Sequence, residues 1–196
     1  MPMISSSTAL MAALKNHQVI PEVLDAFRQK VMLTVSFPSG VEATMGNTLK
    51  VADTQDLPKL NLVFAETPAK AYTIAFTDPD APRRGDNKWS EFAHMLVTDI
   101  KPTVGEGGES FEVDVSKGTV HIPYMGPGPP EKTGLHRYVF AVFEQEDAVS
   151  IDSSVKDNRP NWGTGKPGYG LRDWVKTQKG LTLVGANYFL ARNEVQ

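Results

Sequence analysis

Hydrophobic positions follow two different periods along the chain, and the change of period predicts its regular structure. Residues 5–8 carry hydroxyl side chains and precede apolar positions 9, 10, 13 and 14, which lie on one face of a helix. The hydroxyl groups can satisfy the free backbone amides at the start of such a helix. A second short helix is expected after Pro21, with apolar side chains on one face at Val23, Leu24 and Phe27. Residues 1–29 are therefore predicted to form an N-terminal helical segment.

From residue 30 to residue 149 the pattern changes to short runs rich in Val, Thr, Phe and Tyr, separated by Gly and Pro clusters. Such spacing is typical of an all-β sandwich. The clearest strands are Ala71–Thr77, His94–Asp99 and His136–Glu144. Each of them is mostly apolar at successive positions, which predicts central strands of a sheet that is buried on both faces.

Loops are expected at 105–108 and 126–130, and the second is stiff because prolines alternate with glycines. A helix at about 170–178 and a final strand at 181–190 follow. The chain has 196 residues, of which 40% are hydrophobic, so it can bury one sizeable core. We therefore expect a single domain over residues 1–196, mostly β, in which short helices flank a β-sandwich.

Composition narrows the class of protein. Lys and Arg total 20 against 23 Asp and Glu, so the formal net charge of -3 favours neither nucleic acid nor an anionic membrane surface. The chain has no cysteine, which excludes disulfides, thiolate metal ligands and cysteine nucleophiles. No apolar run is long enough to span a bilayer, and the chain begins without a basic leader or an uninterrupted apolar core. We therefore expect a soluble cytoplasmic protein with no transmembrane segment and no nucleic-acid partner.

Three strand ends carry the side chains best suited to a site. In the segment Asp78-Pro79-Asp80-Ala81-Pro82, the prolines hold two carboxylates in a narrow range of positions, although the segment alone is equally typical of an ordinary turn. His94 opens a second strand, and His136 opens a third, two residues before Tyr138. A lone histidine in front of an apolar strand is usually a structural hydrogen-bonding group.

Loops at one end of a sandwich bring distant residues together, so these strand ends can converge. Two imidazoles and a tyrosine hydroxyl would then donate to the oxygens of an anion. The aspartates would orient the imidazoles or receive an ammonium group. A zwitterion such as phosphoethanolamine fits this combination of charges.

A hydrolase is the alternative from another class. His94 or His136 would act as general base, with an aspartate orienting the ring. The chain has no Gly-x-Ser-x-Gly elbow, no glycine-rich phosphate loop and no His-Glu-x-x-His helix, so no nucleophile or catalytic residue is nominated. A divalent metal site on Asp78, Asp80, His94 and His136, and a purely structural pocket, are further alternatives. No metal or cofactor is expected.

Several motifs taken together resemble the phosphatidylethanolamine-binding protein family. The motifs are Asp78–Pro82, Trp89–His94, Gly126–Pro130 and Gly134–Tyr138. A similarity to the fungal branch, which includes carboxypeptidase Y inhibitors, extends over nearly the whole chain. It is carried by residues 43–49, 88–92, 159–163 and 185–189.

The resemblance implies a β-sandwich flanked by short helices, an anion pocket at one end and a cis bond between Ala81 and Pro82. Carried over residue by residue, the pocket contains Asp78, Asp80, Pro82, Trp89, His94, Gly128, Pro129, His136 and Tyr138. Trp89 stands where many relatives have tyrosine, which removes one hydroxyl donor and makes the pocket wall more apolar.

Members of the family are non-enzymatic binding modules, and the resemblance implies the same here. Some bind phospholipid headgroups, some inhibit a serine carboxypeptidase, and some regulate Ras or kinase signalling through protein contacts. The expected ligand is therefore a phosphate or a phospholipid headgroup. The expected protein partner is a serine carboxypeptidase or a component of a Ras or kinase pathway.

Overall fold

The apolar runs of the sequence form the inner strands of a five-stranded antiparallel sheet. In this computed structural model, which describes residues 3–103, 110–147, 149, 155 and 158–196, the strand order is β7-β5-β4-β8-β9. The strands are β4 (Ala71–Asp78), β5 (Phe92–Ile100), β7 (Thr119–Ile122), β8 (His136–Gln145) and β9 (Leu181–Ala191). The three strands predicted as central, β4, β5 and β8, are the inner ones, and the predicted final strand is β9. Both predictions are confirmed.

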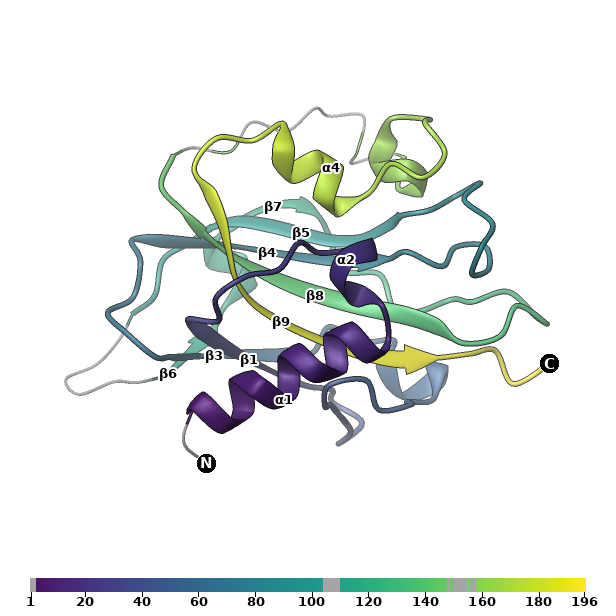
Figure 1. Cartoon of the computed structure of the whole chain (residues 1–196), viewed down its shortest axis with the longest axis horizontal. Helices are drawn as coiled ribbons and strands as arrows, with labels where there is room; N and C mark the ends of the chain where they lie inside the picture. The colour runs from purple at the N-terminus through teal and green to yellow at the C-terminus, as the bar shows by residue number, and fades with distance from the viewer. Residues whose placement is uncertain (1–2, 104–109, 148, 150–154, 156–157) are drawn as a thin grey trace.

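A four-stranded antiparallel sheet packs on one face of the larger one, with the order β2-β1-β3-β6 (Figure 1). Its strands are β1 (Val31–Ser36), β2 (Glu42–Ala43), β3 (Lys59–Phe64) and β6 (Ser110–Val113). Buried and partly exposed positions alternate along β1 and β3, as expected for strands with one face on a core. The predicted loop at 105–108 lies outside the described residues.

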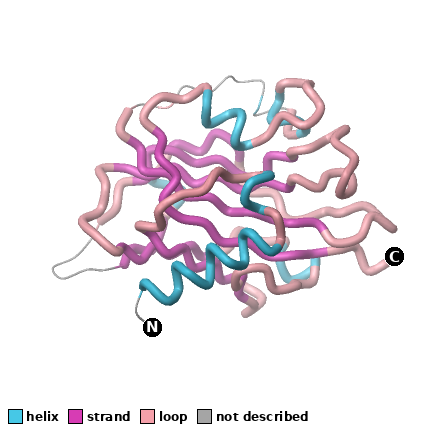
Figure 2. The backbone as a smooth tube through the Cα atoms, viewed as in Figure 1, coloured by secondary structure: helices cyan, strands magenta, loops and turns pink. Residues whose placement is uncertain are grey.

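The larger sheet is buried on both faces because it separates two hydrophobic cores. Phe76 of β4 and Phe140 of β8 stack at 3.9 Å between the two sheets. The intervening residues, such as Ala75 and Ala141, belong to the second core on the opposite face. Helices and loops cover that face, as the tube in Figure 2 shows. The mostly apolar pattern of these strands therefore reflects two-sided burial.

The helices are short and lie outside the sheets. They are α1 (Met3–Asn16), α2 (Val19–Glu22) and α4 (Leu171–Lys176), with 3-10 turns η1 (Val51–Thr54), η2 (Val115–Lys117) and η3 (Pro160–Gly163). The predicted helix before the last strand is α4. The sequence predicts that residues 5–8 precede the first helix and satisfy the free backbone amides at its start. This prediction is wrong, because α1 begins at Met3 and these residues lie inside it. No helix in the described part of the chain is both long and apolar enough to cross a membrane.

The prediction of a short helix after Pro21 is wrong. The turn α2 ends at Glu22, and residues 25–30 have no regular structure. Val23 and Leu24 are nevertheless buried in the second core. This stretch connects α2 to β1 across the sheet, and an extended chain advances about twice as far per residue as a helix. Apolar spacing predicted which side chains are buried but not the backbone that buries them.

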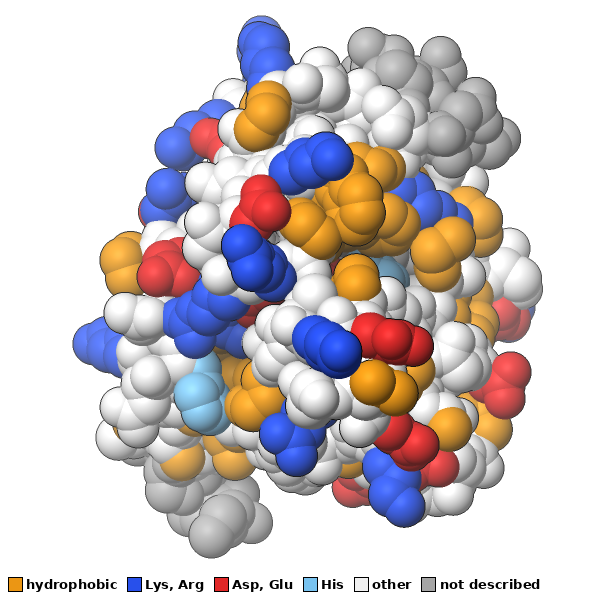
Figure 3. Space-filling model, turned by 90° about the vertical axis from the view of Figure 1, so that its right-hand side faces the viewer, with side chains coloured by type: hydrophobic (Ala, Val, Ile, Leu, Met, Phe, Trp, Pro, Cys, Tyr) orange, Lys and Arg blue, Asp and Glu red, His pale blue; other side chains and the backbone are white. Residues whose placement is uncertain are grey.

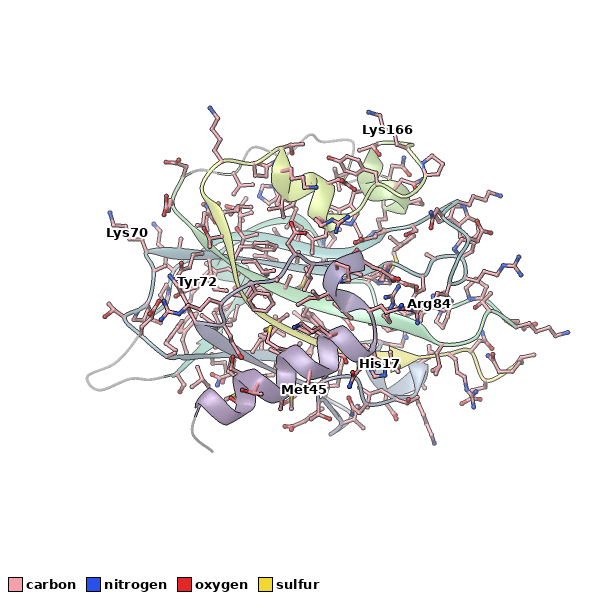
Figure 4. All side chains as sticks on the ribbon, viewed as in Figure 1. His17, Met45, Lys70, Tyr72, Arg84 and Lys166 are labelled. Atoms are coloured by element: carbon pink, nitrogen blue, oxygen red, sulfur yellow. The ribbon has the colours of Figure 1, made fainter. Side chains whose placement is uncertain are left out.

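The N-terminal segment packs on the sandwich. Leu10 and Leu14 of α1 are 4% and 0% exposed in the second core. At the end of α1, His17 Nδ1 lies 2.7 Å from the hydroxyl of Tyr188 on β9, and that hydroxyl donates to the Ala13 carbonyl at 2.8 Å. Figure 4 shows His17 at this end of the helix. The segment is therefore held by apolar burial and by side-chain hydrogen bonds.

Candidate functional site

A pocket of about 150 Å³ lies where the ends of β4, β5 and β8 meet the loop at 126–130. It is lined by Asp78, Ala81, Pro82, Trp89, Phe92, His94, Met125, Gly126, Gly128, Pro130 and His136. Figure 3, which looks at this end of the molecule, shows a cluster of hydrophobic side chains around a hollow with a histidine inside it. The strand ends predicted to converge do converge.

Asp78 and His136 form a buried pair at the base of the pocket. Asp78 Oδ2 lies 2.8 Å from His136 Nδ1, and Asp78 Oδ1 accepts the backbone amide of Asp80 at 2.7 Å. The other ring nitrogen of His136, Nε2, lies 2.9 Å from the Thr133 hydroxyl. Both ring nitrogens of His136 are therefore occupied by protein groups, so this histidine holds Asp78 and the 126–134 loop in position.

Asp80 lies close to Asp78 in sequence but faces away from the pocket. Its Oδ2 accepts from the backbone amide and Nε of Arg137 at 2.9 Å, and its Oδ1 accepts from Arg137 Nη2 at 2.8 Å. Arg137 Nη1 also donates to Glu22 at 2.7 Å and to the carbonyls of His17 and Gln18. The pair Asp80–Arg137 therefore joins the strand ends to the N-terminal segment, and sequence reasoning missed this role of Arg137.

His94 differs from His136 because only one of its ring nitrogens has a hydrogen-bond partner among the described residues. Its Nδ1 lies 2.7 Å from the Met125 carbonyl, which can only accept, so Nδ1 carries a proton. Burial lowers the pKa of His94 below its usual value, although the carboxylate of Asp78 acts in the opposite direction. The ring is therefore neutral at pH 7, and its Nε2 is an acceptor until it takes up a proton.

Two further residues expected in the pocket lie behind it. Tyr138 is fully buried, and its ring packs against the rings of His94 and Phe76. Burial, together with the nearby carboxylate of Asp78, raises the pKa of its hydroxyl far above the usual value. Pro129 is buried as well, and its carbonyl accepts from Asn193 Nδ2 at 3.1 Å. Both shape the wall without lining the cavity.

The rim of the pocket is apolar and exposed. Trp89 is 39% exposed and Met125 is 43% exposed, and both line the pocket. The ammonium group of Lys88 lies 5.5 Å from the centre of the Trp89 ring. Exposed large apolar side chains gathered around a cavity indicate an interaction surface.

The structure thus brings together six of the nine expected residues in the pocket lining, namely Asp78, Pro82, Trp89, His94, Gly128 and His136. The other three are Asp80, Pro129 and Tyr138. Sequence reasoning missed Ala81, Phe92, Met125, Gly126 and Pro130 as lining residues. The sequence could have indicated these five residues, because each of them lies within or next to one of the family motifs. The Ala81–Pro82 bond is cis, as the resemblance implied.

The geometry fits binding better than hydrolysis. A general base needs a nitrogen within reach of the proton that it removes, and neither ring nitrogen of His136 is open to a ligand. His94 is oriented by a carbonyl and not by an aspartate. Within the described residues, no group of three or more His, Asp or Glu side chains is placed to hold a metal ion.

Comparison with known proteins agrees with the motifs. A family model described as phosphatidylethanolamine-binding protein matches residues 39–189, which is most of the chain. An uncharacterized protein of Saccharomyces cerevisiae is 35% identical over 195 residues, covering 95% of each chain. The carboxypeptidase Y inhibitor of the same yeast is 32% identical over 217 residues, covering 97% of this chain and 98% of the inhibitor.

Similarity extends to three dimensions. A crystal structure of carboxypeptidase Y inhibitor complexed with the cognate proteinase superposes with a TM-score of 0.84. It is 34% identical in sequence, with 96% of this chain and 97% of the inhibitor covered. The architecture of two antiparallel sheets with short helices is therefore shared along nearly the full length of both chains.

Proposed function

The chain belongs to the phosphatidylethanolamine-binding protein family, and we propose that it is a non-enzymatic regulator that binds an anion in its pocket and inhibits a serine carboxypeptidase. The observation that carries the proposal is the pocket itself. It is a preformed cavity with one ligand-facing imidazole, His94, inside an exposed apolar rim. A phosphate or a phospholipid headgroup is the ligand that this chemistry favours.

The anion is expected to bind with uptake of a proton. Neutral His94 offers only an acceptor at Nε2, and protonation turns this nitrogen into a charged donor. Because burial lowers the pKa of His94 in the free pocket, protonation occurs only in acid, and a bound anion stabilises it. Affinity should therefore rise as the pH falls, by up to about tenfold per pH unit above the pKa of the free ring.

An NMR titration with sulfate, which keeps its charge from pH 5 to pH 8, measures this coupling. We expect saturable amide shifts grouped on the pocket-lining residues and tighter binding at pH 5.5 than at pH 7.5. A His94→Gln variant should lose the pH dependence. Phosphoethanolamine and inorganic phosphate, titrated separately, distinguish a headgroup from a free anion. Shifts that are absent or scattered at millimolar sulfate at both pH values would remove the anion site from the proposal.

Inhibition of a carboxypeptidase is supported by the relative that carries this activity in its name and by the apolar rim. Purified yeast carboxypeptidase Y should lose activity in proportion to added protein up to an equimolar ratio. A Trp89→Ala variant should inhibit about 30-fold less tightly, because exposed tryptophans at the centre of an interface are frequent hot spots.

The matched control is Val120→Ala on β7, since Val120 is 42% exposed but lies outside the pocket lining. It should inhibit like the parent protein. Full turnover at excess protein would contradict the carboxypeptidase proposal while leaving the anion pocket untouched. A Ras or kinase pathway partner stays a prediction of the resemblance, because no observation favours it over a carboxypeptidase.

A further inference from the structure

A second cavity, of about 370 Å³, lies on the face of the larger sheet that the helices cover. It opens between the irregular stretch 23–30, helix α4 and the start of β9, which Figure 1 shows around the same part of the sheet. It shares no lining residue with the anion pocket at the strand ends. We call it the α4 groove, and its volume falls in the range of small-molecule sites.

The walls of the α4 groove are apolar. Phe143 of β8 and Leu171 of α4 are fully buried at its base. Higher on the walls the side chains are only partly buried, although they are large and apolar. These are Phe27, Val175, Leu181 and Leu183. An apolar occupant that covered these four side chains would remove their surface from water.

The rim of the groove is cationic. Arg28, Lys30, Arg172 and Lys176 line the groove, and Asp25 is the one acidic side chain among the described residues that line it. Arg28 and Lys30 share Glu66, and Lys30 also pairs with Glu144 at 3.0 Å. The four cations and these three carboxylates leave a net charge of about +1 at the rim.

The rim cations with the fewest ion-pair partners are on α4, which also carries Asp173 outside the groove lining. Arg172 reaches the exposed Asp25 at 3.6 Å, which is a weak contact. Lys176 is one helical turn further on, and no carboxylate of the described residues lies within ion-pair distance of it. An anionic group at the mouth of the groove would therefore gain partners without displacing a strong ion pair.

We propose that the α4 groove binds a single-chain amphiphile with an anionic head, such as a long-chain fatty acid. The alkyl chain lies along Phe143, Leu181 and Leu183, and the carboxylate lies at Lys176 and Arg172. A polypeptide fits less well, because its backbone amides would lose hydrogen bonds to water against apolar walls. An alkyl chain has no such groups.

Dodecanoate, below its micellar concentration, is the probe, and dodecanol is the matched neutral ligand. We expect saturable one-to-one binding of dodecanoate, with NMR shifts of residues 23–30, 171–176 and 181–184. Dodecanol should bind about tenfold more weakly, the ratio that corresponds to about 1.4 kcal/mol for one lost charged contact. Sulfate should instead shift the signals of residues that line the anion pocket at the strand ends, so binding at the two sites can be followed separately.

Two variants test the two halves of the site. Lys176→Glu should weaken dodecanoate about tenfold, while Lys179→Glu, on an exposed lysine outside the lining, should not. Val175→Trp should fill the groove and abolish binding, and an unchanged thermal unfolding curve would show that the variant is folded. Val175 lies in the groove lining and is only partly buried, so the larger ring can enter the groove without displacing a core side chain.

The proposal is overturned if dodecanoate causes no saturable shifts in the three segments. It is also overturned if dodecanol binds as tightly and Lys176→Glu changes nothing, since the site would then recognise any apolar group. Retention of full affinity by a folded Val175→Trp variant would place the ligand elsewhere. None of these outcomes depends on the anion pocket or on carboxypeptidase inhibition.

Discussion

An Arg137→Met variant is expected to lose about 3–5 kcal/mol of the free energy of unfolding. Arg137 and Asp80 are almost completely buried. The guanidinium group of Arg137 donates to both carboxylate oxygens of Asp80 and neutralises their charge. Removing the cation leaves a buried carboxylate without a counter-charge. It also leaves the carbonyls of His17 and Gln18 without this donor. Urea unfolding followed by circular dichroism measures the loss.

Arg84 provides a matched control for Arg137. Figure 4 shows Arg84 near the N-terminal helices. It contacts Gln18 and lies 3.7 Å from Glu22 in the same N-terminal turn, but its side chain is 45% exposed. Arg84→Met should change stability by less than about 0.5 kcal/mol. Adding Asp80→Asn to Arg137→Met should recover about 1 kcal/mol or more, because the unpaired charge is removed. A loss below about 1 kcal/mol in the single variant would contradict the role of this pair.

A Glu91→Gln variant is expected to remove a pH dependence of stability worth about 3 kcal/mol. Burial raises the pKa of Glu91 from 4.5 to about 7 in the folded protein. The carboxyl group accepts from Thr77 at 2.9 Å and from the Leu171 amide at 3.1 Å, both through Oε2. Glutamine keeps one oxygen for these donors and has no charge to desolvate.

The sign follows from proton binding. Between pH 4.5 and about 7 the folded state keeps the proton on Glu91 while the unfolded state releases it, so stability falls as the pH rises. Above about pH 7 the full penalty is present. The variant should therefore match the parent near pH 4 and exceed it by about 3 kcal/mol at pH 8.

Urea unfolding at several pH values between 4 and 8 measures the difference between parent and variant. Glu131→Gln, on an exposed glutamate, should leave the parent's curve unchanged. Parallel curves for the parent and Glu91→Gln would show that folding does not raise the pKa of Glu91, contrary to the expectation.

Hydrophobic patterning predicted the larger sheet well and the N-terminal stretch less well. The strands β4, β5 and β8 are apolar at successive positions because they have a core on each face. The stretch after Pro21 has helical spacing at Val23, Leu24 and Phe27 but an irregular backbone. Tertiary packing overrides local preference there, because the chain has to reach β1.

The candidate site shows a similar division. Sequence motifs alone identified Asp78, His94 and His136, and all three line the pocket. The side to which each side chain turns could not be read from spacing. His136 and Arg137 are neighbours on β8 that take partners on opposite sides, so Asp78 belongs to the pocket and Asp80 to the N-terminal contact.

Local periodicity and short motifs were enough to establish the family, the inner strands and most residues of the pocket lining, because these features are written in residues close together in the chain. Three-dimensional packing was needed to show that both ring nitrogens of His136 have partners, that His94 has one only at Nδ1 within the described residues, and that Arg137 contacts the N-terminal segment. The α4 groove could not be predicted from the spacing of apolar residues along the chain either, because segments far apart in sequence form it. Each of these features depends on distances in space between residues that are far apart in the chain. The spacing of residues along a single sequence does not determine those distances.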